Sequence, residues 1–113
     1  MSAVYDTHVV LKLKPNVEND LVKEIKNYIQ ERTSMAQECK DYILDAKNIK
    51  EIVERVFCGK PLEECSADWE DDNEFMGGFN ASYGWYDVML DVKNIMVKKE
   101  YSNGTKVHID LWD

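Results

Sequence analysis

Hydrophobic and polar residues alternate along the first part of the chain. Between residues 3 and 14, small and apolar side chains fall on one face and mostly charged or polar side chains on the other. This period of two predicts a β-strand with one buried and one solvated face. After Pro15 the apolar positions recur at helical spacing from Val17 to Ile29, which predicts an amphipathic helix over about residues 17–32.

A longer apolar stripe runs from Met35 to Phe57 in steps of three and four. We expect a single helix here, ended by Gly59 and Pro61, although a kink near residues 45–48 is compatible with the same pattern. The stripe has two possible uses: a seam through which the chain self-associates, or a face packed against a sheet. Its width and short length favour packing against a sheet.

Residues 60–73 contain turn formers and acids without any period, which indicates an exposed loop. Glu74 to Ala81 then follow with the pattern of a strand. The glycines at positions 77 and 78 within it indicate a bulge or a close approach of another backbone.

From Tyr83 onward the apolar positions fit a helix and a strand equally well. We favour a helix that is capped by Ser82 and ends at residues 102–104, because the helical stripe runs longer. Asn-Gly at positions 103 and 104 is a strong hairpin signal, so a strand pair over residues 94–112 is the alternative. Alternation from Thr105 onward predicts a final strand.

Together these elements predict one α+β domain that spans residues 1–113, with an exposed acidic loop at about residues 60–74. We expect a small antiparallel or mixed sheet with two or three helices packed on one face. A chain of 113 residues is long enough to bury a modest core without a metal or disulfides.

Cysteine content and the N-terminus bear on the compartment. The chain has three cysteines at irregular spacing, which does not indicate a disulfide framework, and residues 1–7 lack the pattern of a signal peptide. No apolar run approaches the length that a membrane span requires. We therefore expect a cytoplasmic protein without a membrane partner.

Charge is concentrated in one segment. The chain has a net charge of −8, and residues 61–92 contain nine of its 22 acids but no Lys or Arg. Outside this segment the remaining 13 acids nearly balance all 14 basic residues. This acidity disfavours direct binding to nucleic acid, which requires cationic side chains, and favours a basic protein partner.

Two histidines introduce a weaker alternative. His8 and Asp6 share the polar face of the first predicted strand, and His108 and Asp110 share that of the last. If these strands are neighbours, the four side chains form a set suited to a transition metal or to acid–base chemistry. The alternative without a ligand is a polar outer face with complementary charges.

No other motif indicates catalysis or a cofactor. Cys58 and Cys65 do not have the spacing of a zinc site, and Cys39 lies on the apolar stripe as a small core residue would. The glycines form no nucleotide-binding pattern, and the acids near residue 72 lack the order of a calcium loop. We therefore expect no enzymatic turnover and no cofactor.

The acidic segment also contains bulky aromatic residues, a combination typical of a surface that meets a basic partner. Its carboxylates are able to imitate nucleic-acid phosphates, and Trp69 or Phe75 would supply anchoring contacts. The alternative is a solvated loop beside ordinary core aromatics. The predicted partner-binding residues are Glu63, Glu64, Asp68, Trp69, Glu70, Asp71, Asp72, Glu74 and Phe75.

In size, acidity and lack of a catalytic signature, the chain resembles small phage-encoded inhibitors of host defence, of the anti-CRISPR and anti-restriction kind. It is also similar to acidic immunity proteins that neutralise basic toxins. The resemblance covers size and charge and transfers no residue role. It implies stoichiometric inhibition of a basic, nucleic-acid-binding protein such as a host defence nuclease. A metal-binding protein or small metal-dependent enzyme, or a self-associating regulatory subunit, are the alternative functions.

Overall fold

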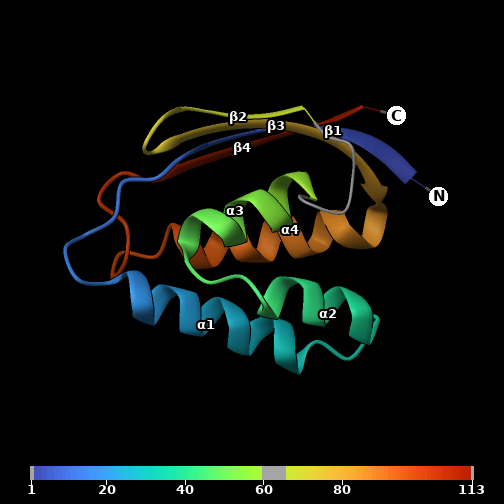
Figure 1. Cartoon of the computed structure of the whole chain (residues 1–113), viewed down its shortest axis with the longest axis horizontal. Coiled ribbons are helices and arrows are strands. Elements are labelled where there is room, and N and C mark those ends of the chain that lie inside the picture. Colours follow the sequence, from blue (N-terminus) through green and yellow to red (C-terminus); the bar gives the residue numbers. More distant parts are fainter. Residues whose placement is uncertain (1, 60–65, 113) are drawn as a thin grey trace.

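The computed structural model describes residues 2–59 and 66–112. In chain order the elements are β1 (Ser2–Val10), α1 (Glu18–Glu31), α2 (Gln37–Leu44), α3 (Ile49–Cys58), β2 (Ser66–Asp71), β3 (Glu74–Ser82), α4 (Tyr83–Met96) and β4 (Lys106–Trp112). The strands form one antiparallel sheet, and the helices all lie on the same side of it (Figure 1). The predicted α+β class, with helices on one face of the sheet, is confirmed.

The first strand of the chain lies inside the sheet, because the strand order is β2-β3-β1-β4. β1 pairs with β3 on one side and with β4 on the other, and β2 pairs with β3, all antiparallel. β1 and β2 are therefore parallel with β3 between them, and β3 and β4 are parallel with β1 between them. This connectivity is that of the split β-α-β, or ferredoxin-like, arrangement.

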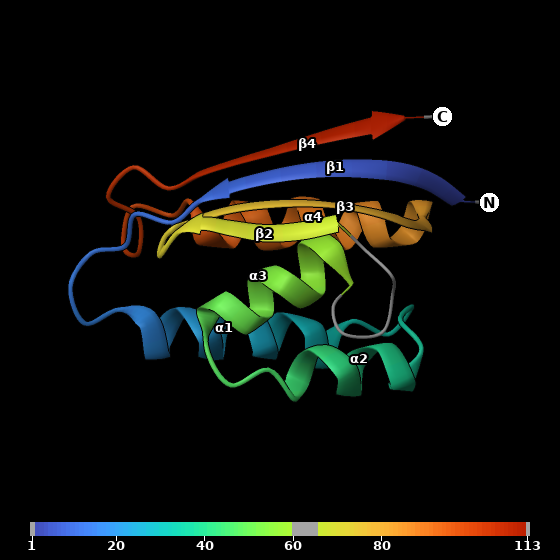
Figure 2. The ribbon, with the colours of Figure 1, turned by 45° about the horizontal axis from the view of Figure 1, so that its top comes forward.

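The helices form two layers beneath the sheet. α3 and α4 pack on β1, β2 and β3, while α1 and α2 lie below them and extend the connection from β1 to α3 (Figures 1 and 2). None of the helices in the described ranges is long and apolar enough to cross a membrane. No helix of the described residues lies on the other face of the sheet, which we call the open face (Figure 2).

Alternation along the strands separates the core from the open face. Tyr5 lies opposite Phe79 and Val9 opposite Phe75, and these four side chains are buried beneath the sheet. The helices complete this core with apolar side chains that have little or no exposed area: Leu21, Ile25, Ile29, Ile43, Ile49, Ile52, Val53, Val56, Phe57, Val88, Met89, Val92 and Met96.

The expectation of one helix over the Met35–Phe57 stripe is wrong. α2 ends at Leu44, and α3 begins after Asn48, whose extended backbone and side chain cap the new helix by accepting a hydrogen bond from Glu51 N at 2.9 Å. The break lies where a kink was considered, and it lets α2 rest on α1 while α3 continues to the sheet. Ile43 and Val53 of the stripe are fully buried, so these positions pack in the core as the favoured interpretation expects.

The expectation of an exposed loop over residues 60–73 is wrong for its second half. Residues 66–71 form β2, which pairs with β3. A register shift between Trp69 and Asp71 interrupts the alternation, and this irregularity explains why the strand has no visible period in the sequence. Residues 60–65 lie outside the described part of the chain.

The later predictions are mostly confirmed. β3 and β4 occupy the predicted ranges, and α4 begins after Ser82, whose hydroxyl accepts a hydrogen bond from Trp85 N at 3.3 Å. The helix ends at Met96, earlier than expected, and the alternative strand pair over residues 94–112 is absent from this described segment. Gly104, at φ 104°, instead belongs to a turn in which Asn103 N donates to Lys12 O at 2.6 Å.

Candidate protein-binding surface

The acidic hairpin consists of Asp68, Glu70, Asp71, Asp72 and Glu74, at the adjoining ends of β2 and β3. The first four side chains are exposed, and Glu74 is partly exposed. β2 is an edge strand, so this row of carboxylates occupies one border of the sheet. Glu63 and Glu64, which were also predicted to bind a partner, lie outside the described residues.

Trp69 and Phe75 do not project from the hairpin. Phe75 is fully buried, and the Trp69 ring packs on it with centroids 5.0 Å apart. Trp69 Nε1 donates to Glu54 at 3.1 Å, and Lys50 Nζ lies 4.9 Å from the Trp69 ring centroid. These aromatics attach β2 to the core, so the expectation that they anchor a partner is not supported.

The three most exposed large apolar side chains of the described residues lie elsewhere, on the open face. Trp112 is 58% exposed, Val4 46% and Met76 45%, and they come from β4, β1 and β3. Val4 lies directly opposite Trp112, and Met76 lies directly opposite both His8 on β1 and Asp68 on β2. The open face thus combines apolar groups with the carboxylates of the hairpin. The sequence pattern did not show that these apolar residues lie near one another.

Carboxylates also face one another across this surface. Asp6 on β1 lies directly opposite Asp110 on β4, and Asp71 lies opposite Glu74. Like charges at directly opposed positions of a sheet are destabilising. Lys106 and the two histidines are the only basic side chains on the described strands. The fold therefore concentrates negative charge on this surface, and a cationic group bound there would reduce the repulsion between the carboxylates.

The first and last strands are neighbours, which is the condition that the metal-site alternative required, and His8 lies directly opposite His108 as Asp6 lies opposite Asp110. Their side chains have other partners, however. His8 Nε2 lies 2.6 Å from Glu74 Oε2, and His108 Nε2 lies 3.0 Å from Asp110 Oδ1. Asp6 accepts a hydrogen bond from Trp112 Nε1 at 2.9 Å. Among the residues that the structure describes, no three His, Cys, Asp or Glu side chains form a group able to hold a metal.

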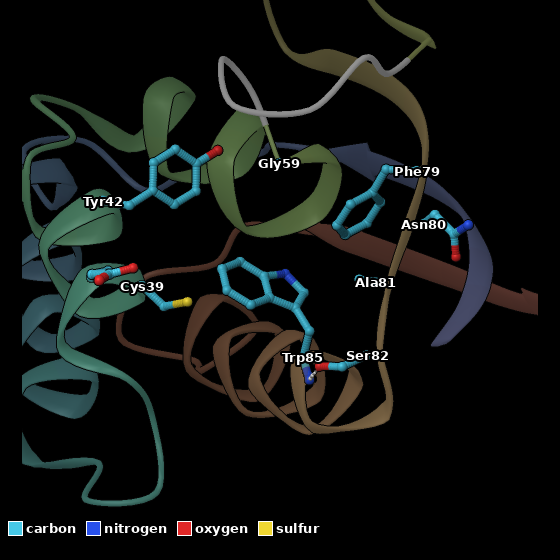
Figure 3. A pocket seen from close by; sticks show the side chains of 9 residues that line it. Cys39, Tyr42, Gly59, Phe79, Asn80, Ala81, Ser82 and Trp85 are labelled. Atoms are coloured by element: carbon cyan, nitrogen blue, oxygen red, sulfur yellow. Dashed lines mark hydrogen bonds between the residues drawn. The ribbon is translucent and has the colours of Figure 1, made fainter. Parts of the chain in front are cut away.

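A cavity of about 290 Å³ lies on the other side of β3, between α2 and α4. Figure 3 shows Cys39 and Tyr42 of α2 facing Trp85 of α4 across it. The Trp85 indole donates to Val56 O at 2.7 Å, so its polar atom is engaged in the fold. Both histidines of the chain lie on the open face, on the other side of the sheet, and the Cys39 thiol has no imidazole beside it for nucleophilic chemistry.

Comparison with protein-family models, with curated proteins and with solved structures finds no match to this chain.

Proposed function

We propose that this protein binds a basic protein through the acidic hairpin and the open face, and that it thereby inhibits a nucleic-acid-binding partner without turnover. The observation that carries this proposal is the pair of opposed carboxylate sets, Asp6 with Asp110 and Asp71 with Glu74, on an uncovered sheet. A partner that inserts Lys or Arg side chains among them gains attraction and removes repulsion.

The open face supplies apolar contacts beside this charge. Trp112 and Met76 are large, exposed and set among carboxylates, an arrangement that provides both desolvated anchors and electrostatic steering. Attraction from the hairpin would accelerate encounter, and burial of Trp112 would slow dissociation. A basic groove that is occupied in this way is closed to nucleic acid.

The test compares two triple charge reversals with equal net charge. The first replaces Asp68, Asp71 and Asp72 with Lys, and these three side chains are exposed on the hairpin. The matched control replaces Glu31, Glu38 and Asp41 with Lys; these side chains are exposed on α1 and α2, in the layer farthest from the sheet. Circular dichroism and thermal melting verify that both variants are folded.

Wild-type protein is immobilised and exposed to the nucleic-acid-binding fraction of a bacterial lysate, and each captured protein is then titrated in pure form. We expect the hairpin reversal to weaken binding on the order of a hundredfold, because like-charge contacts cost several kcal/mol. The control should bind nearly as the wild type does, and added salt should weaken both complexes. The captured partner should also lose nucleic-acid binding in proportion to added inhibitor.

Equal affinity for the two reversals, or binding that is indifferent to salt, would contradict an electrostatic interface on this surface. If the partner still binds nucleic acid in the presence of this protein, the proposed binding would stand and the proposed inhibition would be contradicted.

A further inference from the structure

The two edges of the sheet differ in how they are protected against pairing with another strand. β2 has a register shift and carries Asp68, Glu70 and Asp71, and both features discourage pairing with a strand of another molecule. β4 pairs with β1 in continuous register over seven residues, has no proline and alternates regularly. Among the described strands, none pairs with its outer edge.

β4 also extends past the helices that cover its neighbours. α3 and α4 pack mainly on β1, β2 and β3, and β4 lies at the border of the molecule in Figure 2. Leu111 points toward the helical side of the sheet and is nevertheless 39% exposed, while Trp112 is exposed on the open face. At the end of β4, both faces of the strand therefore expose apolar side chains to solvent.

The sequence of β4 is complementary to itself when two copies run antiparallel about a two-fold axis at Ile109. His108 then lies opposite Asp110 of the second copy, Val107 opposite Leu111, and Lys106 opposite Trp112. Each of these pairs is favourable: an acid with an imidazole, two aliphatic residues, and a cation with an aromatic ring. The two-fold axis generates each of them twice.

Other symmetric registers are poorer. An axis at Asp110 sets two carboxylates against each other, and an axis at His108 sets two imidazoles together and pairs only residues 106–110 of the strand. An axis between two residues would place apolar positions opposite polar ones, because successive side chains point to opposite faces. The register at Ile109 is the one that pairs all seven residues of β4 with matched chemistry.

We infer that β4 is a homodimerisation strand, and that two copies of this chain join β4 to β4 antiparallel to form one continuous eight-stranded sheet. The occupant of the edge is a second copy, because the charge and apolar pattern of β4 matches itself. The pairing buries Leu111 and continues the open face across both copies. This inference does not depend on the basic partner proposed above.

The test uses two variants, each of which should self-associate weakly, whereas a mixture of the two should associate strongly. In Asp110→Lys the introduced lysine faces His108 of the second copy, and in His108→Asp the introduced carboxylate faces Asp110. Mixed one to one, the two chains place the lysine opposite the new carboxylate and His108 opposite the native Asp110. Asp110→Lys also removes the like-charge pair with Asp6 within the chain, so the variant should remain folded.

Sedimentation velocity over a concentration series measures the dimer dissociation constant. We expect a wild-type dimer, about tenfold weaker self-association in each variant, and recovery in the mixture, as two reversed cross-strand pairs predict. Asp87→Lys, which changes the net charge as Asp110→Lys does but at an exposed position of α4, should dimerise like the wild type. Amide hydrogen exchange at residues 106–112 should slow as the dimer forms.

A wild-type chain that stays monomeric up to its highest soluble concentration would overturn the inference. So would a dimer that both variants retain, or a mixture that associates no better than its components.

Discussion

Two tyrosines, Tyr28 and Tyr101, join α1 to the second half of the chain. Tyr28 on α1 donates a 2.5 Å hydrogen bond to Asp91 on α4, and it accepts one from Arg32 at 3.0 Å. Tyr101 donates to Glu24 at 2.5 Å, and Lys98 also bonds this carboxylate.

Burial, together with the bond to Asp91, raises the pKa of Tyr28 to about 12. The bond to Glu24, together with burial, raises the pKa of Tyr101 to about 12. The bond of Tyr28 connects α1 to α4, and the bond of Tyr101 connects α1 to the turn between α4 and β4.

Replacing Tyr28 with Phe tests this role. The change removes the donor to Asp91 and keeps the ring, so we expect a loss of about 1.5–3 kcal/mol in the free energy of unfolding, as for a hydrogen bond to a charged group. Urea denaturation measures the loss. A double-mutant cycle with Asp91→Ala, which removes the acceptor, isolates the pairwise coupling, and a coupling energy near zero would assign the stabilising effect of Tyr28 to its ring alone.

At the scale of elements, β3 determines how closely the helical layer approaches the sheet. Gly77 lies opposite Thr7 on β1, and Thr7 Oγ1 donates to Phe57 O on α3 at 2.8 Å. A Cβ built on Gly77 would lie 2.9 Å from the Phe75 ring and 3.0 Å from Cys58 Cβ. The end of α3 therefore packs directly against the β3 backbone at Gly77, which has no side chain to separate them. The space at position 77 is tight, but side-chain atoms of Phe75 and Cys58 fill it and not the second backbone that the sequence suggested.

Gly77→Ala should consequently destabilise the protein by about 1–3 kcal/mol, because the added methyl group meets packed atoms on two sides. Gly84→Ala is the matched control in α4: its nearest neighbour is Ser82 Oγ at 3.8 Å, and alanine favours the helix by about 0.5–1 kcal/mol. Thermal melting compares the two variants. Equal melting temperatures would contradict a tight α3–β3 contact.

At the scale of the whole molecule, the tyrosine and carboxylate clusters make stability depend on pH at both extremes. A pKa raised in the folded state stabilises the fold below the ordinary tyrosine pKa of about 10, and the stabilisation is lost as pH rises through the folded pKa. The pKa of Glu24 is lowered, chiefly by its hydrogen bond to Lys98 and then by that to Tyr101. Its contribution is present above the ordinary carboxyl pKa and is lost as pH falls through the lowered value.

We therefore expect wild-type stability to decline between about pH 10 and 12 through these two tyrosines. A Tyr28→Phe/Tyr101→Phe double variant should be less stable at pH 8 and should lose less stability over the alkaline range. Chemical denaturation at several pH values measures both curves. Parallel curves for the two proteins would show that the tyrosines do not control the alkaline transition.

The sequence alone determined the elements whose periodicity is regular and whose ends are marked by local chemistry. β1, α1, β3 and β4 follow from alternation or helical spacing, because burial on one face imposes these periods wherever the partner elements lie. The pattern of α4 fitted a helix and a strand equally well, and the length of its stripe favoured the helix, with Ser82 as its cap. The acidity of the β2–β3 region is likewise visible without a structure. β2 was missed because its bulge and its acids hide the alternation.

Tertiary structure alone decided which residues share a surface. Pairing of β1 with both β3 and β4 brings Asp6, Asp110 and Glu74 onto one open face from positions up to 104 residues apart, and no local signal encodes such pairing. Packing also turned Phe75 and Trp69 inward, since a core accepts aromatic rings from any flanking strand. The break between α2 and α3 arises similarly, because α2 packs on α1 while α3 must reach the sheet.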